Sequence, residues 1–396
     1  MGSLLNFVFL KDTHEYNGDE TYAMQGPIFY YLIKNEYSYT LNGQLKPGYK
    51  NLLLIESSHK LQSLLNIPND VYDFIKNNDI KLLFTSIPDP CNRPTYDLGI
   101  SYIQTKLSNT KYYIIDSNRR LEGILSFDFF LEESIWNRNQ FFGKEITDLG
   151  YVSEEIQLNE LDSYRNKKFI CFNRALDKEH RISLLNEYLT GNYSDSYFTF
   201  LLKTEGFARI YDNKLNNNQK QQIDVDFFNS KLPIELDTHS ISDKSHFRVN
   251  NTFKKELFLN SCINLVTESS FQQNELFVSE KILKPILNYQ PFIVFAGYGY
   301  LKHLKTYGFK TFSDFWDESY DEIVNPEERF FALLKLVRML NKKSIDELNE
   351  LYKNLKHICI YNKHIWDNLE INTFEKISSF SIMSCVLIVV LKFIGL

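Results

Sequence analysis

The chain has 396 residues, which is too long for one ordinary hydrophobic core and predicts two domains. Hydrophobic residues make up 43% and charged residues 24%, a composition that excludes a disordered protein. The net charge of −6 provides no overall basic field, so no nucleic-acid partner is predicted. A phosphate-bearing ligand would need a local cluster of Lys and Arg side chains. The five cysteines show neither metal-ligand spacing nor an even disulfide framework, which favours a reducing compartment over secretion.

The first part of the chain alternates strand and helix signals. Short apolar runs predict strands at residues 6–10, 51–56, 81–86 and 111–116. Helical patterns lie between them at residues 26–34, 59–76 and 96–107. Short continuous apolar strands separated by helices indicate a parallel sheet that is covered on both faces.

An acidic, irregular stretch at residues 126–161 is a predicted linker, and the same alternation begins again after it. Strands are predicted at residues 168–172, 197–202, 262–267 and 291–296, and helices at 177–189, 279–288 and from Pro326 to about Leu369. The fold class is therefore α/β with two Rossmann-like domains and C-terminal helices. The expected boundaries are 1–150 and 160–330 for the α/β domains, 331–375 for a helical extension and 376–396 for an apolar tail.

The two ends of the chain bear on its location. No signal peptide is predicted at the N-terminus, where Met1 to Asn6 lacks a basic leader. Residues 380–396 are almost wholly apolar, with Lys392 as their only charge, and are borderline in length for a membrane span. We expect a cytoplasmic protein, and both membrane association through the tail and a packed or interfacial terminal helix stay open.

Candidate ligand-binding residues follow the predicted strands, because ligands of open α/β sheets bind beyond the carboxyl ends of the strands. Asn173 and Arg174 follow the strand at 168–172, and Arg181 lies on the next helix. Glu268 follows the strand at 262–267. These positions predict a polar site at one edge of the second sheet.

The sharpest candidate is the start of the helix predicted at 279–288. Ser279 is a good N-cap, which leaves backbone N–H groups facing an anion, and Lys281 adds positive charge. Glu280 could accept hydrogen bonds from the paired hydroxyls of a ribose, and the ring of Phe277 could stack on a base. The alternative is a capped surface helix with an ordinary Glu-Lys dipeptide.

Three segments resemble the donor-binding signature of the alpha-1,3-fucosyltransferase family: I-N-L-V-T-E-S-S at 263–270, F-V-S-E-K-I-L at 277–283 and Q-P-F-I-V-F-A-G at 290–297. The family shows a strand ending in Phe-Glu-Asn, then an aromatic residue, any residue and Thr-Glu-Lys, then a helix and Pro with a short strand. Thr267 and Ser269 stand where the family has Phe and Asn. The resemblance covers roughly residues 168–321 and implies two domains facing across a cleft, the GT-B type.

By this resemblance, Glu280 would bind the ribose, Lys281 and Arg181 the donor phosphates, and Glu268 would lie near the donor sugar. Phe277 would stack on the base. Arg174, with Asn173 before it, competes with Arg181 for the phosphate role. The implied partners are a nucleotide-sugar, with GDP-fucose as the leading donor, and a glycan or other hydroxyl acceptor. The implied mechanism inverts the anomeric carbon and requires no cofactor or metal.

Inverting transfer needs a base that takes the acceptor proton, and family precedent places a Glu after an N-terminal strand. Asp89 occupies the comparable place, between two prolines that also suit a turn. Glu56, at the end of another predicted strand, is the second candidate. The polar run from Asp12 to Glu15 is the third and is the more suited to touching acceptor.

Other functional classes have weaker signals. The letters Asp224-Val225-Asp226 fit a metal-dependent transferase motif but follow a polar loop. The pair His239 and His246 lies in loop-like surroundings rather than a zinc-site pattern. A non-catalytic two-lobed protein that binds nucleotide-sugars or glycans remains the alternative to an enzyme.

Overall fold

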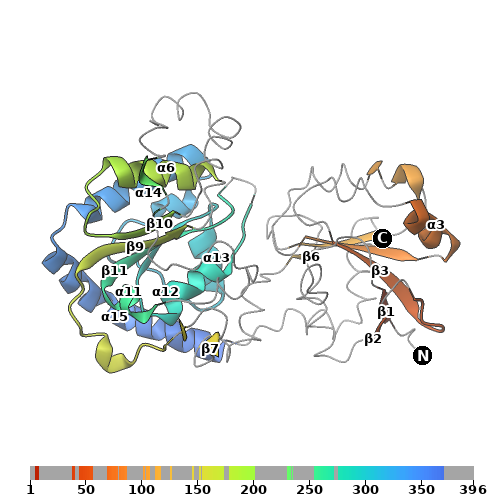
Figure 1. Cartoon of the computed structure of the whole chain (residues 1–396), viewed down its shortest axis with the longest axis horizontal. Helices are drawn as coiled ribbons and strands as arrows, with labels where there is room; N and C mark the ends of the chain where they lie inside the picture. Colours follow the sequence, from red (N-terminus) through yellow and green to blue (C-terminus); the bar gives the residue numbers. More distant parts are fainter. Residues whose placement is uncertain are drawn as a thin grey trace. The chain divides into compact units, whose positions relative to one another are not determined.

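A computed structural model gives the structure of the chain. It describes residues 5–8, 38–40, 44–56, 69–78, 80–86, 101–102, 104–107, 112–116, 125–126, 145–146, 151–152, 154–173, 178–200, 230–232, 234, 254–271 and 275–369. The chain divides into two compact units (Figure 1), of which the first comprises residues 1–133 with 371–396 and the second residues 134–370.

The first unit contains a six-stranded parallel sheet with the strand order β2-β1-β3-β4-β5-β6. Its strands are β1 (Leu5–Val8), β2 (Ser38–Thr40), β3 (Lys50–Glu56), β4 (Lys81–Ser86), β5 (Tyr112–Asp116) and β6 (Leu125–Ser126). The helix α3 (Asn69–Asn77) precedes β4, and residues 101–102 and 104–106 are also helical. The four apolar runs that predict strands all form strands of this sheet. The predicted helix at 26–34 lies outside the described residues.

A buried polar side chain, that of Asn6, fixes the register of the first three strands. Asn6 is fully buried and pairs directly with Ser38 on one neighbouring strand and Asn51 on the other. Its Nδ2 donates to Asn51 Oδ1 at 2.9 Å, and its Oδ1 accepts from the Ser38 hydroxyl at 2.8 Å. Because a slip of one residue would leave the buried Asn6 amide without these partners, the network specifies one register.

The second unit contains a four-stranded parallel sheet with the order β10-β9-β11-β12. Its strands are β9 (Lys167–Asn173), β10 (Tyr197–Phe200), β11 (Ser261–Thr267) and β12 (Phe292–Phe295). Every residue of the central strand β11 and of the edge strand β12 is buried, as expected for a sheet covered on both faces. The predicted α/β class with parallel sheets in two units is confirmed.

Helices cover both faces of the second sheet (Figure 1), with α6 and α14 on one face and α11, α12 and α15 on the other. Their bounds are α6 (Glu179–Thr190), α11 (Lys255–Leu259), α12 (Leu283–Leu287), α13 (Tyr300–Thr306), α14 (Pro326–Asn341) and α15 (Ile345–Asn368). Single turns of 3₁₀-helix lie at η2 (Leu158–Glu160), η3 (Glu280–Ile282) and η4 (Ser319–Glu322). Cys171, Cys262 and Cys359 are buried free thiols.

The predicted domain boundaries differ from the observed units in two places. The stretch at 126–161 contains a short antiparallel pair, β7 (Glu145–Ile146) with β8 (Tyr151–Val152), and falls mostly within the second unit. The helices after Pro326 are not a separate extension, because α14 packs on β12, and α15 packs on β9, β11 and α12. Their apolar stripes complete the core of the second unit. The apolar tail at 380–396 lies outside the described residues.

Candidate functional site

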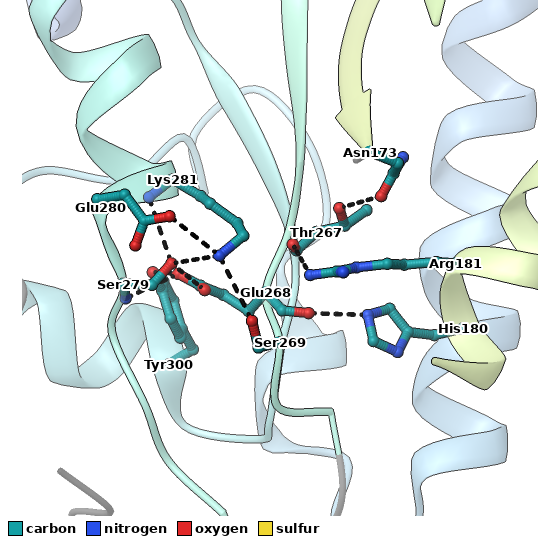
Figure 2. A network of polar contacts seen from close by, with 10 residues as sticks. All are labelled: Asn173, His180, Arg181, Thr267, Glu268, Ser269, Ser279, Glu280, Lys281 and Tyr300. Atoms are coloured by element: carbon teal, nitrogen blue, oxygen red, sulfur yellow. Dashed lines mark hydrogen bonds and ion pairs between the residues drawn. The ribbon is translucent and has the colours of Figure 1, made fainter. Parts of the chain in front are cut away.

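The carboxyl ends of β9, β10 and β11 are joined by side-chain hydrogen bonds. The Thr267 hydroxyl donates to Asn173 Oδ1 at 2.6 Å, so the last residues of β11 and β9 are linked (Figure 2). The backbone N–H of Asn173 donates to Thr199 Oγ1 of β10 at 3.0 Å. These contacts hold the ends of the three strands in place relative to one another, and the loops that follow start from there.

The first turn of α6 packs against the loop after β11. His180 and Arg181 are both about 5% exposed. His180 Nε2 lies 2.9 Å from the backbone oxygen of Glu268, and its ring stacks on Phe271 with the ring centroids 4.8 Å apart. Arg181 Nη2 donates to the backbone oxygen of Thr267 at 3.3 Å. Helix α6 therefore brings a guanidinium group to the carboxyl end of β11.

The segment that starts at Ser279 is shorter and tighter than the predicted helix. Ser279 is the N-cap and accepts a hydrogen bond from the backbone N–H of Lys281, as predicted. The first turn is 3₁₀-helical, η3, and α12 follows it for five residues. Pro285 explains the split, because it has no N–H to give to the carbonyl of Lys281 and its ring crowds that carbonyl. Tyr289, with φ of 52°, then ends the helix.

Lys281 is the centre of a group of polar side chains (Figure 2). Its ammonium group lies 3.3 Å from Glu280 Oε1, 3.2 Å from Ser279 Oγ and 3.4 Å from Ser269 Oγ. Its side chain is 28% exposed, whereas that of Glu280 is 10% exposed. The ammonium group is therefore held in place but reachable from solvent, which is what a contact to a bound anion requires.

The carboxylate of Glu268 lies beneath this group and is completely buried. Its Oε1 accepts from the Ser279 backbone N–H at 3.1 Å and from the Tyr300 hydroxyl at 2.7 Å. Its Oε2 accepts from the Ser279 hydroxyl. Three donors around one carboxyl group suit the ionised form, which only accepts hydrogen bonds.

The surroundings of His180 are electropositive. The pKa of His180 lies well below its ordinary value, chiefly because burial disfavours the charged imidazolium, and next because of the neighbouring Arg181. Lys178 and Arg329 lower this pKa further, against the opposing effect of the hydrogen bond to Glu268. Three cationic side chains thus make the electrostatic potential positive at the buried His180 ring, at the edge of the sheet. An anionic ligand near this point would be stabilised.

The structure brings most of the predicted donor-site residues together. Five of them lie within one connected network: Asn173, Arg181, Glu268, Glu280 and Lys281. Asn173 uses its side chain on Thr267 and on Cys171 Sγ, so it acts as a link within the sheet. Glu268 likewise uses both carboxylate oxygens on the protein itself.

Other predicted residues fall elsewhere. Phe277 is only 2% exposed, so its ring lies in the packed interior and offers no face to a base, contrary to its predicted stacking role. Glu56 is the last residue of β3. Asp89, Arg174, the motif at 224–226 and the histidines at 239 and 246 lie outside the described residues.

Two residues of the site were not predicted from the sequence. Tyr300 begins α13 and donates to Glu268, and Arg329 of α14 contacts Phe271. Tyr300 follows the end of β12, so the carboxyl-end rule could have selected it. Arg329 lies four residues before Leu333 and seven before Leu336, in phase with the buried stripe of its helix. The presence of a charged residue on an apolar stripe could have indicated from the sequence that Arg329 has a buried role.

Comparison with known proteins finds similarity at the level of structure. No family model matches the chain, and no curated protein matches it in sequence. The chain resembles solved structures of alpha1,3-fucosyltransferase. One crystal structure of alpha1,3-fucosyltransferase is 14% identical, with a TM-score of 0.38, and the match covers 93% of this chain and 91% of that one. A crystal structure of alpha1,3-fucosyltransferase with GDP is 12% identical, with a TM-score of 0.37, over 92% and 93% of the two chains.

Two further features are absent from the residues that the structure describes. Among these residues, no three His, Cys, Asp or Glu side chains gather as metal ligands would. Among them too, no helix has the length and apolar character needed to cross a membrane.

The lowered pKa of His180 predicts that stability depends on pH. Because the pKa is lower in the folded chain than in the unfolded chain, the contribution of the neutral imidazole is present above pH 6.5 and is lost as the pH falls below it. Between pH 7 and 5.5 this loss is about 1 kcal/mol. We expect His180→Phe, which keeps the aromatic stacking, to show a correspondingly smaller fall in the free energy of unfolding from urea titrations at the two pH values.

The control is His357→Gln, which removes an exposed histidine from α15. It measures what the loss of one exposed histidine does to the pH dependence, so that the effect of His180→Phe can be compared with it. Equal slopes for the wild type and His180→Phe would contradict the prediction.

Proposed function

We propose that the second unit binds a nucleoside-diphosphate sugar and that the protein is a glycosyltransferase, with GDP-fucose as the leading donor. The observation that carries the proposal is the pairing of Lys281 with Glu280 beside the end of β11, 3.3 Å apart and partly open to solvent. A cation and a carboxylate held side by side provide one group for phosphate and one for ribose hydroxyls. The family signature across 263–297 supports the same assignment.

The proposed roles follow from position and charge. Lys281 contacts the diphosphate through its ammonium group, and Glu280 accepts hydrogen bonds from the ribose. Arg181, which is buried, adds positive potential at the carboxyl end of β11 and stabilises the charge on the leaving diphosphate. Glu268 acts on the site through Ser279 rather than by contact with the sugar, since it is completely buried and both its carboxylate oxygens accept hydrogen bonds from Ser279 or Tyr300.

In the proposed reaction, an acceptor hydroxyl oxygen attacks the anomeric carbon of the donor sugar. The bond from that carbon to the diphosphate oxygen breaks, and the diphosphate leaves with the electron pair, so that the anomeric configuration inverts. Asp89 is the proposed base for the acceptor proton, and Glu56 is the alternative. No metal ion is required, because cationic side chains carry the charge of the leaving group. The acceptor is a glycan or another hydroxyl compound.

The second candidate function is a non-catalytic protein that binds a nucleotide-sugar or a glycan. The donor residues would serve either function equally. Slow hydrolysis of the donor to sugar and nucleoside diphosphate, without added acceptor, distinguishes the enzyme from the binding protein.

A thermal-shift screen of nucleotides and nucleotide-sugars tests the proposal. A ligand present at 100 times its dissociation constant adds about 2.7 kcal/mol to the stability of the folded state. For a unit the size of residues 134–370, this raises the Tm by about 5–10 °C. We expect GDP and GDP-fucose to produce this shift, also in the presence of EDTA, and the double variant Glu280→Ala/Lys281→Ala to lose it.

The matched control is Glu350→Ala/Lys353→Ala, which removes an exposed Glu-Lys ion pair of α15 and also leaves the net charge unchanged. It should keep the full shift. If no nucleotide shifts the Tm of the folded wild type, the donor site is wrong and so is the proposed function.

A further inference from the structure

The single proton of the Ser279 hydroxyl has a fixed direction. Glu268 Oε2 accepts it, and an ionised carboxyl group has no proton to return. The lone pairs of Ser279 Oγ are therefore left for Lys281, whose backbone N–H donates at 3.3 Å and whose ammonium group donates at 3.2 Å. The buried carboxylate thus makes Ser279 an acceptor toward Lys281 (Figure 2).

Tyr300 also holds the carboxylate, and it belongs to a different element, α13. Its hydroxyl donates to Glu268 Oε1 at 2.7 Å, and its side chain is only 1% exposed. Tyr300 is the one donor to this carboxylate, among those described above, that does not belong to Ser279. Through this hydrogen bond, Tyr300 connects the segment that begins at Ser279 (η3 and α12) to a different element of the fold, α13.

The start of α13 is itself anchored. Asp321 Oδ1 accepts from the backbone N–H of Leu301 at 2.9 Å, and Oδ2 accepts from that of Lys302 at 3.0 Å. The backbone oxygen of Asp321 accepts from Gly299 N–H at 2.6 Å. Gly299 has φ of 73°, in the left-handed region that favours glycine, and turns the chain into the helix. The backbone is therefore fixed by hydrogen bonds both immediately before and immediately after Tyr300, so the position from which its hydroxyl donates to Glu268 is fixed as well.

We propose that Tyr300 is a positioning residue, which acts through Glu268 and Ser279 to set the place of the Lys281 ammonium group for a ligand diphosphate. The inference rests on the proposed function, because it takes Lys281 as the phosphate contact. It assigns a role in diphosphate affinity to a residue of α13 that acts through a buried carboxylate.

The test compares Tyr300→Phe with Tyr352→Phe in the full chain. Both tyrosines are buried, and each hydroxyl donates a hydrogen bond that Phe would lose, that of Tyr352 being to the Tyr289 backbone oxygen at 3.0 Å. Tyr289 follows the C-terminal end of α12, so the control loosens the other end of the same segment. We expect Tyr300→Phe to weaken the binding of both GDP and inorganic pyrophosphate about tenfold by calorimetry. Tyr352→Phe should lower the Tm and leave both dissociation constants unchanged.

Hydrogen exchange provides a measurement without any ligand. Tyr300→Phe should speed amide exchange at Ser279, whose N–H donates to Glu268, and at Lys281, whereas Tyr352→Phe should not. Glu268→Gln is a second variant of nearly the same shape. Its amide group brings a donor to the Ser279 hydroxyl, so we expect a loss of pyrophosphate affinity larger than tenfold.

Two results would overturn the inference alone. One is that Tyr300→Phe binds GDP and pyrophosphate as tightly as the wild type does. The other is that both tyrosine variants weaken binding equally, which would indicate a general loss of structure. If the wild type binds neither compound, the proposed function fails, and the role of Tyr300 in ligand binding fails with it.

Discussion

Lys281→Met is expected to weaken the binding of GDP about 100-fold, a loss of about 2.7 kcal/mol in binding free energy. The Met side chain keeps most of the apolar stem and removes only the ammonium group. The loss has two parts, because the diphosphate loses a charge-assisted hydrogen bond and Glu280 loses its ion-pair partner. An unpaired carboxylate beside the phosphates then repels them. Titration calorimetry of the variant against GDP at fixed ionic strength measures the effect.

Lys353→Met is the matched control, since it removes one lysine charge from the exposed surface of α15. It should change the dissociation constant of GDP by less than twofold, because solvent and salt screen an exposed charge. A loss below threefold for Lys281→Met would contradict the assignment of this lysine to the phosphates.

Glu280→Gln separates the contribution of Glu280 to ligand binding from that of Lys281. In the ligand-free structure the Glu280 carboxylate competes with any anion for the Lys281 ammonium group, at a distance of 3.3 Å. The same variant should therefore bind inorganic pyrophosphate more tightly than the wild type and GDP less tightly, because the ribose loses its acceptor. A parallel change for both compounds would show that Glu280 does not distinguish ribose from phosphate.

Four strands of the first sheet and all four of the second could be predicted, because local sequence determines them, whereas the short strands β2 and β6 were not predicted. Short, mostly apolar runs have no polar face, and a strand covered on both sides is the arrangement that buries them. The boundaries at β3, β4, β9 and β11 agree with these runs to within one residue. The helices after Pro326 were also predicted, but the sequence left open whether they pack on the second domain or cross back toward the first. Periodicity shows which face a helix buries and says nothing of what covers it.

The site could be predicted in part for a similar reason. Its residues follow strand ends, and the carboxyl ends of parallel strands lie at one edge of a sheet. What local sequence could not indicate is which polar side chains face the ligand and which face each other. Glu268 and Asn173 occupy predicted positions, yet their oxygens are used on Ser279, Tyr300 and Thr267. These partners are separated by 11 to 94 residues, and only the folded chain brings them together.

Arg329→Met is expected to lower the free energy of unfolding of the second unit by about 4 kcal/mol. Arg329 is 1% exposed, and its guanidinium group donates to four backbone oxygens, those of Phe271, Ala296, Ile323 and Val324. Met has a similar volume but no donor, so these carbonyl groups would be left in the interior without this partner. All three tryptophans of the chain lie within residues 134–370, so urea unfolding followed by tryptophan fluorescence reports on this unit.

Lys335→Met on the same helix is the control, because Lys335 is an exposed residue of α14. The loss of an exposed charge changes the stability by at most about 1 kcal/mol, so the two variants should differ by about 3 kcal/mol. A difference below 1 kcal/mol would mean that the backbone groups around Arg329 find other partners. The larger effect would also reach the site, since Arg329 holds Phe271, on which His180 stacks beside Glu268. The order of the loop after β11 would then depend on Arg329, a buried residue that is far from Lys281 in sequence.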